Sequence, residues 1–275
     1  MNYNLKISEY SSIAEALLYK GFDFNNYASS FFHKRIEESM IKFETFDTSN
    51  LIKRLENDIF ISDFVHFLRP SVTEFFRDPT MWLAVANEIV PKLLKKEDVN
   101  VYFPQCSSGE ELYSFLIILE QLNAIEKVNV FADEISEKHI EFIKTGIYPH
   151  RKIEAGEKNY DILGYQTPLS HYIPPEESKT PIKKSLLSNT KFNSTGWFDI
   201  DTQKKFDIIF FRNNMIYYNS DLQRTVVNLL YEMLEKNGYL IIGTMENLPA
   251  YPEIKLSFFN KHEKIYKKQT GIWTR

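Results

Sequence analysis

Acidic side chains follow two neighbouring apolar stretches of this sequence, at positions where an α/β protein could bind a ligand. Glu110 and Glu111 follow the first stretch, and Asp133 and Glu134 follow the second. Open α/β sheets bind ligands beyond the carboxyl ends of their strands. Carboxylates placed there would repel phosphate but attract an ammonium group or the hydroxyls of a ribose. The four acids therefore favour a nucleoside cofactor without phosphate, such as S-adenosylmethionine, which has an ammonium, a sulfonium and a ribose.

Structural roles for the same residues are an alternative interpretation. In the segment 104–111, Ser107 or Ser108 could cap the following helix, and the two glutamates would then favour the helix dipole. The acids at 133–134 could equally be solvated loop residues. Gly109 is the one glycine of the 104–111 turn, and the chain has 9 glycines in all. It contains neither a G-x-G-x-x-G nor a P-loop motif, which argues against a nucleotide held by its phosphates.

The composition is that of an ordinary soluble protein, with 275 residues, of which 43% are hydrophobic and 25% charged. The net charge of −4 does not favour binding to nucleic acid. Cys106 is the only cysteine, which excludes an internal disulfide and a cysteine-based zinc cluster. The histidines lack the H-E-x-x-H spacing, so no metal site is expected. With no apolar run of about 18 residues and no signal-peptide pattern, we expect a cytoplasmic protein that does not insert into a membrane.

The pattern of apolar residues predicts two kinds of structure along the chain. Residues 1–68 have helical periodicity, whereas from about residue 80 short apolar strands alternate with helices, which predicts a parallel sheet covered on both faces. The strands are predicted at 99–103, 128–132, 206–211 and 239–243, the helices at 81–95, 110–122, 137–145 and 220–234, and a terminal hairpin at 255–268. The stretch 146–206 lacks this alternation, and we interpret part of it as an inserted β subdomain with short strands near 171–173 and 184–192.

Five segments occur in an order and spacing that resemble one known family. They are S-V-T-E-F-F-R-D-P at 71–79, C-S-S-G-E-E-L-Y-S at 106–114, A-D-E-I-S at 132–136 followed by G-I-Y at 146–148, F-D-I-I-F-F-R-N-N-M-I-Y-Y at 206–218, and G-T-M-E-N-L at 243–248. These are similar to the N-x-T-x-F-F-R-D, C-S-T-G-E-E-P-Y-S, A-T-D-I-D, F-D-x-I-F-C-R-N-V-x-I-Y-F and G-H-S-E-x-L motifs of the CheR-type chemotaxis receptor methyltransferases.

The resemblance implies an α/β fold: a Rossmann-like S-adenosylmethionine-dependent methyltransferase domain with an N-terminal all-helical domain and a small inserted antiparallel β subdomain. We place the helical domain at 1–76, the methyltransferase domain at 77–275 and the insert at about 165–193. The implied activity is that of a protein-glutamate O-methyltransferase in chemotactic signal transduction. Its partner would be the helical coiled coil of a chemoreceptor's cytoplasmic domain. Its products would be glutamyl methyl esters and S-adenosylhomocysteine, and the protein would be a monomer.

Matched position by position, the resemblance also implies roles for individual residues. Arg77 and Tyr217 would be catalytic, with Tyr217 beside the transferring methyl group. Glu111 or its neighbour Glu110 would hold the amino group of the cofactor, and Glu134 rather than Asp133 would bind its ribose. The residues expected to contact the cofactor are Ser71, Thr73, Arg77, Glu110, Glu111, Glu134, Phe211, Arg212 and Asn213.

Several residues depart from the family motifs and leave two other interpretations open. Ser71 stands in place of an asparagine, Leu112 of a proline, Glu134 of an aspartate and Met245 of a serine, and Gln105 occupies a position that is often small. One alternative is a catalytically weak or inactive relative that binds the cofactor as a sensor or signalling partner. The other is a methyltransferase that acts on a small molecule or on a different protein.

Esterification of a glutamate by a sulfonium is an in-line displacement. The attacking carboxylate has an ordinary pKa of about 4.3 and is ionised at neutral pH, so no general base is required. Arg77 is therefore expected to orient the substrate, with a structural ion pair as its alternative role. Tyr217 could hydrogen-bond the carboxylate, pack beside the methyl group or serve only as a core tyrosine. For docking an acidic receptor helix, the N-terminal region offers a weak basic face that consists of Lys34, Arg35, Lys42, Lys53 and Arg54.

Overall fold

The computed structural model describes residues 5–69, 73–174, 183–194, 203–249, 251 and 253–269. The chain divides into two compact units. The first unit consists of Met1–Ser71 and Asn214–Val227, and the second of Val72–Asn213 and Asn228–Arg275. This division lies a few residues before the boundary predicted at residue 76. It also joins a segment from the C-terminal half of the sequence to the N-terminal helices.

The first unit is helical, as the sequence predicts. Its elements are α1 (Ile7–Tyr19), α2 (Ser29–Lys42), α3 (Thr48–Arg54), α4 (Asp58–Leu68), a 3₁₀ turn (Met215–Tyr217) and the first residues of α10 (Ser220–Met233). Helix α1 packs on α3, and α2 packs on α4. Ile13, Leu17, Ile36 and Met40 are fully buried between them, because residues three or four positions apart share one helix face. Asp47 begins α3 by accepting a hydrogen bond of 2.7 Å from the N–H of Asn50.

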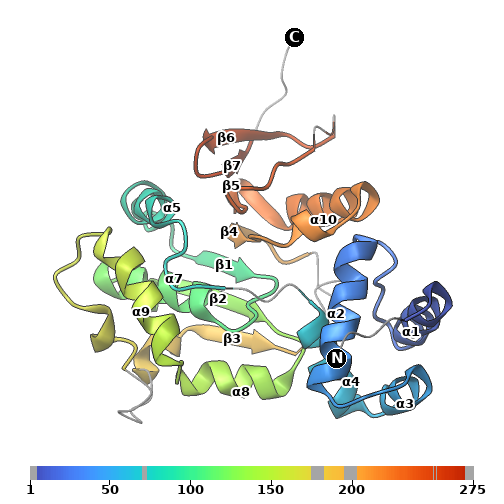
Figure 1. Ribbon diagram of the computed structural model, residues 1–275. Coiled ribbons are helices and arrows are strands. Elements are labelled where there is room, and N and C mark those ends of the chain that lie inside the picture. The colour runs from blue at the N-terminus through green and yellow to red at the C-terminus, as the bar shows by residue number, and fades with distance from the viewer. Residues whose placement is uncertain are drawn as a thin grey trace. The chain divides into compact units, whose positions relative to one another are not determined.

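The second unit is built on a seven-stranded sheet with the order β3-β2-β1-β4-β5-β7-β6 (Figure 1). The strands are β1 (Val99–Phe103), β2 (Val128–Asp133), β3 (Thr190–Asn193), β4 (Phe206–Phe210), β5 (Leu234–Ile241), β6 (Leu256–Asn260) and β7 (Ile265–Lys268). The first five pair in parallel, and β7 is antiparallel to both β5 and β6. The predicted parallel sheet and terminal hairpin are thus confirmed, although β5 begins earlier than predicted, at Leu234.

Helices precede β1 and follow β1 and β2, and those that follow a strand position the loops at the carboxyl ends of the strands. They are α5 (Pro79–Ala84), a π-helical turn (Val85–Ile89), α6 (Val90–Leu93), α7 (Glu110–Gln121), α8 (Glu137–Thr145) and α9 (His150–Asp161). The single helix predicted at 81–95 is divided because Pro91 has no N–H to continue the α-helical pattern. The N–H of Val90 bonds instead to the carbonyl of Val85, five residues back. No helix among the described residues is long and apolar enough to cross a membrane.

The region predicted as an inserted antiparallel β subdomain, about 165–193, differs from the prediction where it is described. The expected strand near 171–173 is a 3₁₀ turn, Leu169–His171, and a second 3₁₀ turn covers Lys184–Leu187. The one strand described here, β3, pairs in parallel with β2 and so extends the main sheet. Residues 175–182 lie outside the described residues. Short apolar stretches cannot distinguish a strand from a buried turn, because both bury two or three neighbouring side chains.

Helix α9 lies in the stretch 146–206, where the sequence pattern predicts no helix. Its buried residues are Ile153, Gly156 and Tyr160, spaced three and four apart, which is a helical signal of only three positions. Gly156 is required at that place, because a Cβ there would lie 2.5 Å from the Cβ of Phe75. The small residue lets the helix lie directly against the loop that follows residue 73.

Candidate cofactor site

The loop between β1 and α7 has a backbone that only certain residues can adopt. Gly109 stands immediately before α7 with a φ of +88°, and Ser107 has a φ of +54°. The N–H of Gly109 bonds to the carbonyl of Cys106, and the N–H of Cys106 bonds to the carbonyl of Asp133, each at 2.9 Å. These bonds hold the end of β1 beside the end of β2.

Cys106 is a packing residue of this loop. Its side chain is buried, and burial together with the carboxylates of Glu134 and Asp133 raises the pKa of the thiol well above its ordinary value. A thiol in such surroundings stays protonated at neutral pH and is a poor nucleophile. Its position between strand ends also shows that the acidic loops after β1 and β2 lie close together.

The carboxylate of Glu110 lies at the centre of a buried polar network at the N-terminus of α7. Its side chain is completely buried and pairs with the ammonium of Lys152, which comes from α9. The same carboxylate accepts hydrogen bonds from the hydroxyls of Thr73 and Ser108, the latter at 2.5 Å. The hydroxyl of Tyr148 fixes this loop by donating to the carbonyl of Ser108 at 2.7 Å.

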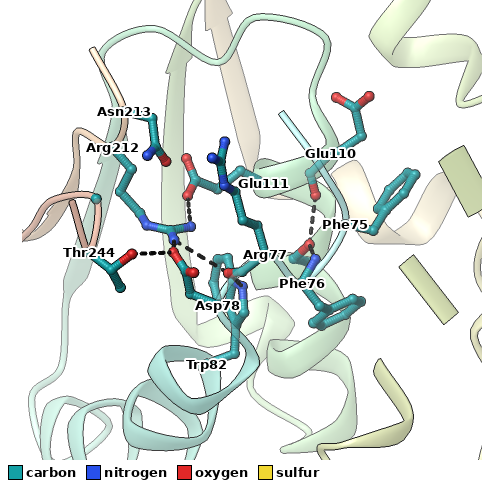
Figure 2. Close-up of polar contacts among 12 residues, drawn as sticks. Phe75, Phe76, Arg77, Asp78, Trp82, Glu110, Glu111, Arg212, Asn213 and Thr244 are labelled. Carbon is teal, nitrogen blue, oxygen red and sulfur yellow. Dashed lines mark hydrogen bonds and ion pairs between the residues drawn. The ribbon is translucent and has the colours of Figure 1, made fainter. Parts of the chain in front are cut away.

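A second network surrounds the guanidinium of Arg212 (Figure 2). The side chain of Arg212 is 2% exposed. It forms ion pairs with Glu111 and Asp78 and donates a hydrogen bond to the carbonyl of Arg77 at 3.3 Å. The hydroxyl of Thr244 also reaches the Asp78 carboxylate, at 3.4 Å. Arg212 thereby ties the end of β4 to the start of α7 and to the loop before α5.

The loop of residues 73–78 is held by its aromatic side chains and its backbone. Phe75 and Phe76 are fully buried, and Phe75 packs edge-on against Tyr148 with ring centroids 4.9 Å apart. The N–H of Phe76 donates to the hydroxyl of Ser114 at 2.8 Å. Arg77, between these anchors and Asp78, is half-buried, and its side chain extends alongside Glu111 (Figure 2).

Backbone strain gathers around these networks. Phe76, Asp78, Ser107 and Asn213 all have φ between +54° and +59°, a region that costs energy for residues other than glycine. Such conformations persist where surrounding contacts enforce them, and they are frequent at ligand sites.

At the end of β2 the two acids have different environments. Asp133 is 2% exposed, accepts hydrogen bonds from the Tyr102 hydroxyl at 2.5 Å and the Asn193 amide at 2.8 Å, and has a pKa raised by burial. Its carboxylate is thus committed to holding β1, β2 and β3 together. Glu134, one residue further, accepts a hydrogen bond from the N–H of Ser136 at 3.1 Å. Glu134 is also buried, at 4% exposure, and its assignment to the ribose stays a prediction.

Glu246 is a buried residue of the site that the sequence analysis did not assign. Its carboxylate accepts hydrogen bonds from the N–H of Asn213 at 2.8 Å and of Gly243 at 2.6 Å. It therefore fixes the loops after β4 and β5 relative to each other. Gly243 leaves room for this contact, since a Cβ there would lie 2.9 Å from the Glu246 carboxylate and 2.6 Å from the side-chain amide nitrogen of Asn213. The G-x-x-E spacing of 243–246 is the signal that could have identified it.

The structure brings most of the predicted cofactor residues together in the second unit. These are Thr73, Arg77, Glu110, Glu111, Glu134, Phe211, Arg212 and Asn213. Phe211 is buried, and its N–H bonds to the carbonyl of Ile241 at 2.9 Å. Ser71 lies outside the described residues. Tyr217 belongs to the first unit, where its ring packs on Phe31 with centroids 4.3 Å apart.

The network residues that sequence reasoning missed are distant partners of the predicted ones. Lys152 carries no local signal, because it is an ordinary surface-type residue until the fold places it beside a buried charge. Asp78 belongs to the F-F-R-D motif, but its partner Arg212 is far away in the sequence. Among the described residues no group of three or more histidine, cysteine or acidic side chains could hold a metal ion.

The charges suit a cationic nucleoside. Acidic residues outnumber basic ones in this part of the second unit, with Asp78, Glu110, Glu111, Asp133 and Glu134 against Arg77, Lys152 and Arg212. An excess of carboxylate favours a ligand that carries an ammonium and a sulfonium, and it disfavours one that carries phosphates. The residues therefore fit S-adenosylmethionine.

Comparison with known proteins gives the same result. Residues 71–264 match the CheR methyltransferase, SAM binding domain. A candidate methyltransferase of Pseudomonas putida, named Cher3, is 29% identical over 260 residues, which are 93% of this chain and 95% of that protein. A chemotaxis protein methyltransferase of Borreliella burgdorferi is 28% identical over 211 residues, 72% of each chain. The rRNA methyltransferase aviRa of Streptomyces viridochromogenes aligns with a TM-score of 0.40 at 14% identity, over 72% of this chain and 86% of that one.

The matched domain covers well over half of the sequence and contains the whole network around Glu110 and Arg212. The chain therefore belongs to the CheR methyltransferase family, and it is a methyltransferase whose cofactor is S-adenosylmethionine.

Proposed function

We propose that this protein methylates glutamate side chains on the cytoplasmic helices of a chemoreceptor, and that the resulting glutamyl methyl esters serve chemotactic adaptation. The match of residues 71–264 to the family's SAM binding domain carries the proposal. Relatives at 28% and 24% identity are named chemotaxis protein methyltransferases, which supports the same role. The protein would act in the cytoplasm as a monomer on a helical coiled coil.

The site residues suit a reaction that needs orientation and not proton transfer. A substrate glutamate is ionised at neutral pH, and S-adenosylmethionine supplies the methyl group on its sulfonium. The buried Cys106 thiol stays protonated and takes no part. Alignment of reacting groups can contribute about 7–11 kcal/mol to such a step. The network around Arg212 fixes the loop that carries Arg77, and Arg77 would orient the incoming carboxylate.

We assign the amino group of the cofactor to Glu110 in preference to Glu111. Glu111 pairs with Arg212, which is almost completely buried and is also fixed by Asp78. Glu110 pairs with Lys152, whose side chain is one-third exposed and can move away. Glu134 would bind the ribose, and Thr73, Phe211 and Asn213 would line the remainder of the site. The assignment of Ser71 and Tyr217 to cofactor and methyl group rests on the motif resemblance.

The basic face expected to dock the receptor is partly used within the first unit. Arg35 lies over the ring of Phe67 at 4.2 Å, and Arg54 lies over Phe60 at 4.2 Å. Lys42 also lies over the Phe67 ring, at 4.1 Å. Such cation–π contacts stabilise the helices and hold these three side chains against rings of the first unit. Docking would therefore depend mainly on Lys53, which is exposed, and on Lys34, which is 76% exposed although it pairs with Glu38 at 3.9 Å.

The test is transfer of a radiolabelled methyl group from S-adenosylmethionine to purified chemoreceptor cytoplasmic fragments from the same organism. We expect label on the receptor that is released as methanol by mild base, because a glutamyl methyl ester hydrolyses readily and an N-methyl group does not. Cofactor binding without transfer would instead indicate a sensor, and base-stable label or label on a small molecule would indicate a different substrate.

Replacing Arg77 with alanine should lower the turnover of methyl transfer by about a hundredfold, because the substrate carboxylate loses its orienting cation. Cofactor affinity, measured by calorimetry, should change little. Arg151→Ala, an exposed position on α9, is the matched control and should retain full activity. Undiminished transfer by the Arg77 variant would refute the assignment.

A further inference from the structure

Glu110 combines complete burial with a single described cationic partner. Its carboxylate has no solvent exposure, and it is paired with the ammonium of Lys152. The hydroxyls of Thr73 and Ser108 share its other oxygen. A carboxylate removed from water is costly unless a cation compensates its charge. Lys152 therefore stabilises the fold by neutralising Glu110.

The side chain of Lys152 is held much less firmly than the carboxylate of Glu110, its ion-pair partner. Its side chain is 33% exposed, and its second contact is a 3.3 Å hydrogen bond to the hydroxyl of Ser108. It reaches the site from α9, whereas Glu110 is the first residue of α7. A flexible four-carbon stem allows a lysine ammonium to leave a partner and remain solvated.

A ligand with its own ammonium group would compete with Lys152 for the Glu110 carboxylate. Two ammonium groups on one buried carboxylate repel each other strongly where water is excluded. We propose that Lys152 is an internal counter-ion of Glu110, which competes with the amino group of S-adenosylmethionine and thereby weakens cofactor binding. This rests on the assignment of that amino group to Glu110 in the proposed function. Lys152 is thus a positioning residue that sets cofactor affinity.

Calorimetric titration of the full-length protein tests the competition with three ligands. S-adenosylmethionine and S-adenosylhomocysteine carry the amino group, whereas 5′-methylthioadenosine has the same nucleoside and sulfur without it. For Lys152→Met we expect the first two ligands to bind about tenfold tighter, as for a modest coupling between two binding events. Methylthioadenosine should bind as it does to the original protein. Lys158→Met, on the same helix with a 76% exposed side chain, is the matched control and should change none of the three affinities.

A second pair of variants isolates the role of Glu110. In a Glu110→Gln background there is no carboxylate for which Lys152 and the cofactor's amino group could compete. Adding Lys152→Met should therefore leave all three affinities unchanged. Lys152→Gln, which keeps a hydrogen-bonding group, replaces Lys152→Met if the methionine variant does not fold.

Other outcomes overturn the proposal. Weaker binding of the two amino-bearing ligands would show that Lys152 holds the cofactor's carboxylate, and an equal change for all three ligands would show a general structural role. Unchanged affinities would show that Lys152 does not compete. A protein that behaves as expected here but transfers no methyl group to any receptor would refute the proposed function alone, because the titrations measure binding without a substrate.

Discussion

Replacing Arg212 with methionine is expected to lower the free energy of unfolding by about 3 kcal/mol, because two carboxylates would lose their shared cation in a largely buried place. The side chain of Arg212 is 2% exposed, and those of Glu111 and Asp78 are 13% and 27% exposed. Methionine fills a similar volume, so the loss reflects charge more than packing. Chemical denaturation followed by circular dichroism measures it.

Neutralising the stranded carboxylates should restore part of that stability. The triple variant Arg212→Met, Glu111→Gln, Asp78→Asn leaves no unpaired charge and should unfold at a higher denaturant concentration than Arg212→Met alone. A triple variant no more stable than the single one would show that Arg212 acts through packing. The original protein and Arg151→Met, an exposed substitution, provide the reference values.

Gly109→Ala is also expected to lower the free energy of unfolding by about 3 kcal/mol, because it combines backbone strain with overpacking. Gly109 has a φ of +88°, and an added Cβ would lie 2.9 Å from both the Cγ2 of Ile143 and the hydroxyl of Tyr148. That hydroxyl fixes the Ser108 carbonyl, so the turn beside Glu110 would shift. We expect lower thermal stability and weaker binding of S-adenosylhomocysteine.

Gly21 provides a matched control for the backbone effect. It has the same φ of +88°, and nothing lies within 4 Å of the place its Cβ would take. Gly21→Ala should therefore lower the free energy of unfolding by only about 1 kcal/mol, because only the left-handed backbone is strained. Equal losses for the two variants would contradict the role of the tight packing around Gly109.

The elements that the sequence predicted correctly are those with repeated local signals. Helix α8 and strand β1 were predicted with their exact limits, and β2 and the β6–β7 hairpin to within one residue, because each contains a short run of closely spaced apolar residues. Helix α9 was missed because its sequence is mostly polar and one of its three buried residues is Gly156, which gives no apolar signal. The predicted β insert differs in its described part, because β3 has only four residues and its pairing with β2 is a long-range contact.

The candidate site divides in the same way. The sequence by itself determined the family and the acids that follow β1 and β2, since short motifs carry both. It also favoured a cofactor without phosphate, from the sign of the charges at the strand ends. These inferences need only residues that are neighbours along the chain.

Only the tertiary structure decided what each of those acids does. Glu110 is paired through Lys152 and Glu111 through Arg212, and Asp133 holds strands together while Glu134 stands beside it. Arg212 and its partner Asp78 are 134 positions apart in the sequence. The physical reason is that burial determines how strongly a charged group interacts with its partners. Burial in turn depends on segments that are far away in the sequence.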